Sequence, residues 1–208
     1  MLKIVNLGHA SFLFEGDVSF VIDPYLDNSV PNLKMPRVSV NKVFTSHDHY
    51  DHCGVELVTL VPTNKELKYK TVVVPHDHHN GSKRGLNKMH IFFIDGYKII
   101  HTGDLGCIPS EEVLKEMMDT DVLLAPINGY YTISAEELVT IMNLVKPKVT
   151  IPMHYYRRDD NSGYPDGGQI DIFKKLVGSF KDVDDSIIVN GELLNNRVVI
   201  FNSAMQEK

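Results

Sequence analysis

Residues 45–54 carry the strongest chemical signal in the sequence, because three imidazoles and a carboxylate occur there in the pattern His-x-His-x-Asp-His. Along an extended segment alternate side chains share one side, so His47 and His49 can reach one metal ion. The turn that follows directs Asp51 and His52 toward a second ion. A solvated polar loop is the alternative, but this loop directly follows a predicted buried strand, where scaffolds position functional groups. The segment therefore predicts a site for two metal ions.

Three further potential ligands stand at the C-terminal ends of other predicted strands. His76 follows the β-branched run 71–74, and His154 follows the run 149–153. Asp104 ends a His-Thr-Gly-Asp segment. Polar side chains that follow several apolar strands converge easily at one sheet edge. A bridging carboxylate such as Asp104 would offset the repulsion between two dications held about 3.5–4 Å apart.

Other side chains near these positions are candidates for substrate binding. Lys83 and Arg84 could bind an anionic group, although a basic pair on a polar loop is more often only solvated. Tyr130, Tyr131 and Tyr155 lie beside predicted ligands. They could line the pocket or donate to an oxyanion, and simple packing is an equally good interpretation.

The remaining polar candidates have supporting roles in this interpretation. His9 is expected to orient a loop beneath the site, and Asp23 to accept a hydrogen bond from a ligand imidazole. His101 is expected to support structure rather than bind metal, and His90 to be an ordinary surface or core histidine. These residues are therefore outside the predicted ligand set.

The elements that must position these residues are short strands in the first half and a strand–helix alternation in the second. Ser110 and Ser134 are each followed by acidic residues and are predicted helix N-caps. Two sheets covered by helices on their outer faces would accommodate this order in a single domain, residues 1–208. The predicted helices are 110–118, 134–145 and 169–180, and 55–61 is a short apolar segment. The predicted strands are 2–7, 11–15, 18–22, 42–45, 71–74, 89–95, 98–101, 122–125, 149–151, 186–189 and 197–201.

The sequence resembles the metallo-β-lactamase fold superfamily, and within it short bacterial Zn-dependent hydrolase-like proteins related to ascorbate-6-phosphate lactonase. The likeness covers most of the chain. It is carried by the motifs LGHASF at 7–12, IDPY at 22–25, HDHYDH at 47–52, HD at 76–77, KRGLN at 83–87, TGDLG at 102–106, APINGYYT at 125–132 and PMHY at 152–155.

The resemblance implies an α/β fold of the α+β kind, a four-layer αββα sandwich of two mixed sheets flanked by helices. It also implies a ligand set for each metal. His47, His49 and His76 would hold the first metal, Asp51, His52 and His154 the second, and Asp104 would bridge them. The segment 53–75 is shorter than in most relatives, which would leave the metal cleft more open, and Asn128 replaces a usual glycine beside it.

The third ligand of the first metal has three candidates within residues 75–80, namely His76, His78 and His79. His76 is preferred because it is nearest the strand end. It also agrees with the His-Asp pair in the resemblance. His78 and His79 would then face solvent.

Composition limits the partners of the protein. The net charge is −6 and no Lys/Arg run exceeds two residues, so nucleic acid is not an expected partner. The N-terminus lacks a signal-peptide pattern and no window has the roughly 18 apolar residues that a membrane span needs. Two cysteines form no disulfide framework, so a cytoplasmic setting is expected. The oligomeric state is open, and a homodimer is compatible with the sequence.

Hydrolysis is the leading functional hypothesis. Two ions would bind one water, lower its pKa from about 15.7 toward 7, and present hydroxide to a carbonyl or phosphoryl centre. Asp51 and Asp104 would be the catalytic residues that hold this hydroxide in line. Zinc is the expected metal for a His-rich site, with Mn, Fe, Co or Ni as alternatives. The substrate would be a small anionic molecule, either a lactone or ester or a phosphodiester.

Two other classes of function compete with hydrolysis. A di-iron redox enzyme is disfavoured because no cysteine cluster could deliver electrons, and because His49 stands where a carboxylate would suit iron better. A non-catalytic metal-binding interaction module is disfavoured because a closed structural zinc site needs only four ligands. Seven candidate ligands instead imply open positions for water.

Overall fold

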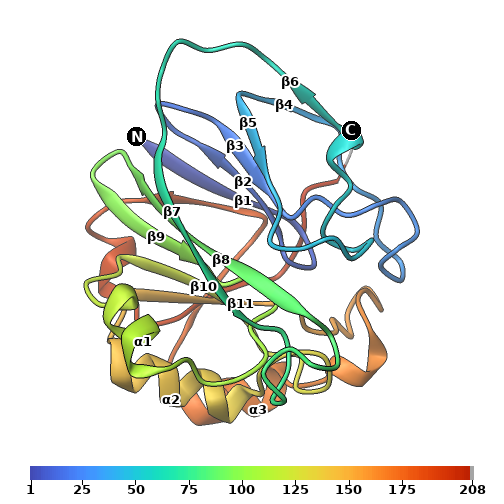
Figure 1. Cartoon of the computed structure of the whole chain (residues 1–208), viewed down its shortest axis with the longest axis vertical. Helices are drawn as coiled ribbons and strands as arrows, with labels where there is room; N and C mark the ends of the chain where they lie inside the picture. Colours follow the sequence, from blue (N-terminus) through green and yellow to red (C-terminus); the bar gives the residue numbers. More distant parts are fainter. Residues whose placement is uncertain (207–208) are drawn as a thin grey trace.

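Two five-stranded mixed β-sheets form the centre of the molecule (Figure 1), and the computed structural model describes residues 1–206. The pairs within the first sheet are antiparallel, except for the parallel pair at its β3–β5 edge. The order of this sheet is β13 (Ser186–Val189), β1 (Leu2–Gly8), β2 (Ser11–Glu15), β3 (Phe20–Ile22) and β5 (Lys42–Phe44).

The second sheet combines a parallel half with an antiparallel half. Its order is β11 (Val149–Met153), β10 (Val122–Pro126), β9 (Tyr97–His101), β8 (Leu86–Ile94) and β7 (Lys68–Pro75). β9, β10 and β11 are parallel, and β7, β8 and β9 are antiparallel. A parallel pair needs a crossover connection, and α2 (Ala135–Val145) supplies it between β10 and β11.

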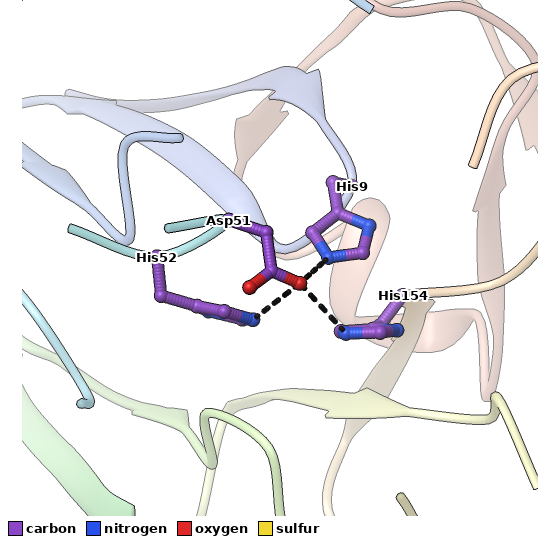
Figure 2. A group of neighbouring side chains, drawn as sticks. All are labelled: His9, Asp51, His52 and His154. Atoms are coloured by element: carbon purple, nitrogen blue, oxygen red, sulfur yellow. Dashed lines mark hydrogen bonds and ion pairs between the residues drawn. The ribbon is translucent and has the colours of Figure 1, made fainter. Parts of the chain in front are cut away.

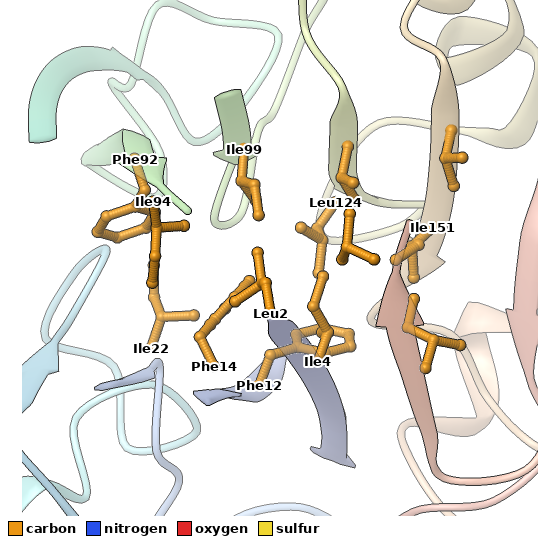
Figure 3. Close-up of a cluster of buried hydrophobic side chains, with 14 of the residues drawn as sticks. Leu2, Ile4, Phe12, Phe14, Ile22, Phe92, Ile94, Ile99, Leu124 and Ile151 are labelled. Carbon is orange, nitrogen blue, oxygen red and sulfur yellow. The ribbon is translucent and has the colours of Figure 1, made fainter. Parts of the chain in front are cut away.

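The main hydrophobic core lies between the two sheets (Figure 3). In β1, Leu2 and Ile4 face the second sheet, whereas Val5 and Leu7 belong to a cluster on the opposite face. This alternation follows from the two-residue period of a strand. Because β1 is covered on both faces, six of its seven residues are buried, and its apolar side chains enter the clusters on both faces.

Three α-helices cover the outer face of the second sheet (Figure 1). They are α1 (Glu111–Met117), α2 and α3 (Ile170–Val177). The predicted caps at Ser110 and Ser134 are present, and Ser134 forms a capping box with Glu137. In the part of the chain that the structure describes, no helix is long and apolar enough to cross a membrane.

The outer face of the first sheet is covered differently from the expected helical layer. Irregular chain including Tyr25, Val30 and Met35 packs there, together with the small parallel sheet of β4 (Val38–Val40) and β6 (Val58–Leu60). Two prolines within residues 25–37 oppose a helix there, because proline lacks a backbone donor. The apolar segment 55–61 forms a 3-10 turn, η1 (Val55–Leu57), followed by β6.

The C-terminal part also departs from the sequence-based expectation. The helix predicted at 169–180 ends at Val177, and Gly178, with φ of +73°, follows it. The chain then forms β12 (Lys181–Val183), which the pattern did not predict. β12 pairs in parallel with β14 (Val199–Phe201), so residues 181–183, just beyond the end of the expected helix, form a strand because a tertiary partner is available.

Candidate metal centre

The predicted ligands meet at one end of the two sheets, in loops that follow β5, β7, β9 and β11. These strands come from both sheets, so the site lies across the sandwich rather than on one layer. The ligand atoms form three overlapping groups, each within 4.8 Å: His47, His49 and His76; His47, His52 and Asp104; and His9, Asp51, His52 and His154.

Asp104 connects these groups. Its Oδ2 atom lies 3.3 Å from His52 Nε2, 3.4 Å from His76 Nε2 and 3.1 Å from His154 Nε2. Its backbone N–H donates to Asn87 Oδ1 at 3.0 Å, which fixes the turn that carries it. The carboxylate is therefore placed between the imidazoles of both proposed metal positions.

The donor atoms of this cluster fit divalent cations. Among the described residues, His52 Nε2, His154 Nε2 and Asp104 Oδ1 are buried and complete no hydrogen bond, although both nitrogens lie close to Asp104 Oδ2. Buried polar atoms normally have a partner, so unpaired atoms that share one small volume point to a ligand. Imidazole nitrogens mixed with carboxylate oxygens are the donors that zinc and related ions accept.

Asp23 orients the imidazole of His52 through a hydrogen bond. Its Oδ2 accepts hydrogen bonds from His52 Nδ1 at 3.0 Å and from Ser46 Oγ at 2.7 Å, and the residue is fully buried. Burial raises the pKa of Asp23, but His52 and its hydrogen bond outweigh burial and lower it to about 2. A proton held on Nδ1 leaves Nε2 of His52 free to bind metal.

The charges at the centre favour metal binding linked to proton release. Burial lowers the pKa of His52, but Asp104, Asp51 and Asp23 outweigh burial and raise it well above the usual value. His47 differs, because burial followed by the His52 charge lowers its pKa to about 3. Metal binding to this cluster therefore has to displace a proton from His52, whereas His47 is already in the neutral form that a metal needs.

A cavity of about 260 Å³ opens beside the cluster. Arg84 and Tyr131, two of the predicted substrate residues, are on its wall, and the Arg84 guanidinium lies 5.2 Å from the Tyr131 ring centroid. Lys83 is exposed and is not among the lining residues. The cavity is lined by His49, Asp51, His76, Arg84, Asp104, Tyr131 and Tyr164.

Other candidates from the sequence lie outside this cavity. Tyr155 donates from its hydroxyl to Phe201 O at 3.2 Å and lines other cavities. His78 is exposed and contacts Glu137 at 2.7 Å, and His79 is also exposed. Within residues 75–80 only His76 joins the ligand cluster.

The histidines assigned to supporting roles divide between the core and the site. His101 lies within hydrogen-bond distance of Ala10 O, at 2.8 Å, and accepts from Gly103 N, which agrees with a structural role. His90 is buried beside Thr45 O. His9 instead belongs to the ligand cluster itself, 3.1 Å from Asp51.

Tyr164 is a site residue that sequence reasoning missed altogether. Its hydroxyl lies 3.2 Å from Asp51 Oδ2 and 2.9 Å from Ser29 O, and its ring lines the cavity. It stands in the Gly-, Asp- and Pro-rich loop 157–168, where no local pattern distinguishes it. The only available signal was its position shortly after His154.

Comparison with known proteins defines the class of this fold and site. Residues 3–154 match the β-lactamase superfamily domain, and the chain belongs to this superfamily. A metal-dependent hydrolase from Archaeoglobus fulgidus is 31% identical over 193 residues, which cover 74% of this chain and 83% of the relative. Another, from Thermoplasma acidophilum, is 27% identical over 210 residues, covering 86% and 92%.

A solved structure supports the same assignment. A metallo-β-lactamase superfamily protein from Thermotoga maritima has a TM-score of 0.77 at 27% identity, covering 99% of this chain and 100% of that chain. The predicted class, a metal-dependent hydrolase of mixed α/β metallo-β-lactamase fold, is thereby confirmed.

Proposed function

We propose that this hydrolase uses two divalent metal ions, zinc in the first instance, to cleave a small anionic lactone, ester or phosphodiester. In this proposal His47, His49 and His76 hold one ion, and Asp51, His52 and His154 hold the other. Asp104 would be shared by the two sites. The relation to ascorbate-6-phosphate lactonase stays a prediction.

The contacts of Asp104 are the observation that carries this proposal. One oxygen, Oδ2, lies within 3.4 Å of imidazoles from both ligand sets. His76 belongs to the first set, and His52 and His154 belong to the second. A carboxylate in that position can neutralise two neighbouring cations at once. A single closed structural ion would not need it.

The residues around the cavity have separable tasks. When bound, the two ions lower the pKa of water and polarise the carbonyl or phosphoryl oxygen under attack. Asp51 and Asp104 both line the cavity, so their carboxylates would accept hydrogen bonds from an attacking water and orient it. A thiolate nucleophile is disfavoured, because burial raises the pKa of both Cys53 and Cys107.

Arg84 supports the anionic substrate class. It is the arginine on the cavity wall, and its guanidinium carbon lies 5.7 and 5.2 Å from the ring centroids of Tyr130 and Tyr131. A guanidinium offers paired donors that match a carboxylate or phosphate. A substrate whose reacting bond lies at Asp104 would place its anionic group toward Arg84.

Metal content tests the proposed centre. Protein purified without added metal or chelator should contain about two equivalents by elemental analysis. His49→Ala should contain less, because it removes one imidazole of the His47 and His76 group. His78→Ala is the matched control, since His78 lies outside the cluster and should leave the metal content unchanged.

Two results would contradict the hydrolase proposal. Metal near zero with no gain on reconstitution would favour an interaction module that does not use metal for catalysis. Two irons per chain with oxygen turnover would instead favour a di-iron redox enzyme.

Substrate charge tests the role of Arg84. Arg84→Met should raise KM for an anionic ester about 10- to 100-fold, because a charge-assisted hydrogen bond contributes about 1.5–3 kcal/mol. KM for a neutral ester of the same size should change little. Lys83→Met removes the neighbouring charge and is the control. Equal effects of both variants on the charged substrate would refute a specific contact.

A further inference from the structure

Two hydrogen-bond donors contact the Asp51 carboxylate, and the sequence did not predict either contact. His9 Nε2 lies 3.1 Å and the Tyr164 hydroxyl 3.2 Å from the same atom, Asp51 Oδ2 (Figure 2 shows His9 on one side of this oxygen). The same oxygen is 3.6 Å from His52 Nε2 and 3.8 Å from His154 Nε2. Asp51 is therefore oriented at the point where it would meet one metal ion.

The conformation of His9 is specified by its surroundings. Its φ of +57° is in the left-handed region, which costs a non-glycine residue free energy and persists only where other contacts enforce it. Its side chain is 1% exposed, and its ring lies 3.8 Å from the His154 ring. Its backbone carbonyl also accepts from His154 N at 3.1 Å. These contacts direct Nε2 at Asp51.

Tyr164 reaches Asp51 from a distant part of the chain. Its hydroxyl has one proton to donate and two acceptors within reach, Ser29 O at 2.9 Å and Asp51 Oδ2 at 3.2 Å. A carboxylate is the stronger of these two acceptors because it is charged. The Tyr164 ring also packs edge-on against His9 at 5.5 Å, so the two donors support each other.

We propose that His9 and Tyr164 are positioning residues that fix the plane of the Asp51 carboxylate for the metal position formed with His52 and His154. The inference rests on the proposed metal centre. Two donors on Oδ2 prevent rotation of the carboxylate, so the direction of its free electron pairs is set before an ion binds. Among the described residues, neither His9 nor Tyr164 has a hydrogen bond to His47, His49 or His76, so the position formed by these three should be insensitive to both variants.

Stepwise metal titration of metal-free protein with zinc tests this proposal. Tyr164→Phe deletes only the hydroxyl and should weaken one of the two binding steps roughly 10-fold, and His9→Met should weaken the same step roughly 10- to 100-fold. His9→Gln should recover most of the loss, because its amide nitrogen reaches as far as Nε2 and can still donate. Tyr131→Phe, which removes a hydroxyl from the same cavity, should not shift either step.

The outcomes separate this inference from the metal centre itself. Wild-type protein that binds no zinc would contradict the centre. Wild-type protein with two steps, both unchanged in Tyr164→Phe and His9→Met, would contradict the positioning role alone. Loss of a whole equivalent at saturation in His9→Met, while Tyr164→Phe is unaffected, would make His9 a direct ligand and also overturn the inference.

Discussion

Asp104→Asn is expected to bind about one metal equivalent instead of two and to lose hydrolysis by about 10³-fold. The substitution preserves size but removes the negative charge. Burial raises the pKa of Asp104, yet His154 and His52 outweigh burial and hold it well below its usual range, so the side chain is a carboxylate in the metal-free protein. Without that charge the repulsion between two dications is no longer offset. Elemental analysis and steady-state kinetics on the same preparations measure both effects.

Asp119→Asn is the matched control for this variant. Asp119 is exposed and distant in sequence from the cluster, and it has a left-handed backbone that asparagine accepts. It should retain wild-type metal content and activity. Asp104→Asn protein with two equivalents of metal and near wild-type activity would show that the carboxylate does not bridge.

Asp23→Asn should have the second large effect, through the protonation of His52. The amide that replaces one carboxylate oxygen is a donor, and it would face His52 Nδ1 or Ser46. If it faces His52, the histidine avoids a donor–donor contact by moving its proton to Nε2, the atom that should bind metal. Metal affinity at that position should fall roughly 10- to 100-fold.

Two measurements on Asp23→Asn check this explanation. Nitrogen NMR of the metal-free protein, recorded at a pH above the raised pKa of His52, should report a neutral His52 protonated on Nε2, where wild type keeps its proton on Nδ1. Urea unfolding should report a loss of about 1–3 kcal/mol for the unsatisfied buried group. Ser46→Ala removes only the hydroxyl partner and should leave the His52 protonation unchanged. An unaltered His52 resonance together with reduced metal affinity would refute the proton-transfer explanation.

The strand pattern and most of the strand-end residues could be predicted because the rules that govern them are local. The alternation of Leu2, Ile4, Val5 and Leu7 places apolar groups on both faces, so a buried strand follows from the sequence. The spacing of His47 to His52 places several donors in one loop. These inferences need only neighbouring residues.

The covering of the first sheet could not be predicted in the same way. An outer apolar face must be buried, but the requirement does not specify a helix. Residues 25–40, together with β6, cover that face with loops and two short strands. β12 likewise exists because β14 is available to pair with it. Such choices depend on partners far away in sequence.

The sequence by itself determined the kinds of donor at this site and the strand ends from which they project. Only the tertiary structure decided that His9 and Tyr164 both meet Asp51, because those contacts join residues 42 and 113 positions away. It also distinguished Arg84 from Lys83, because only Arg84 of these two adjacent residues lines the cavity. Local patterns depend on backbone periodicity, whereas these contacts depend on how distant loops pack, and no local period encodes that packing.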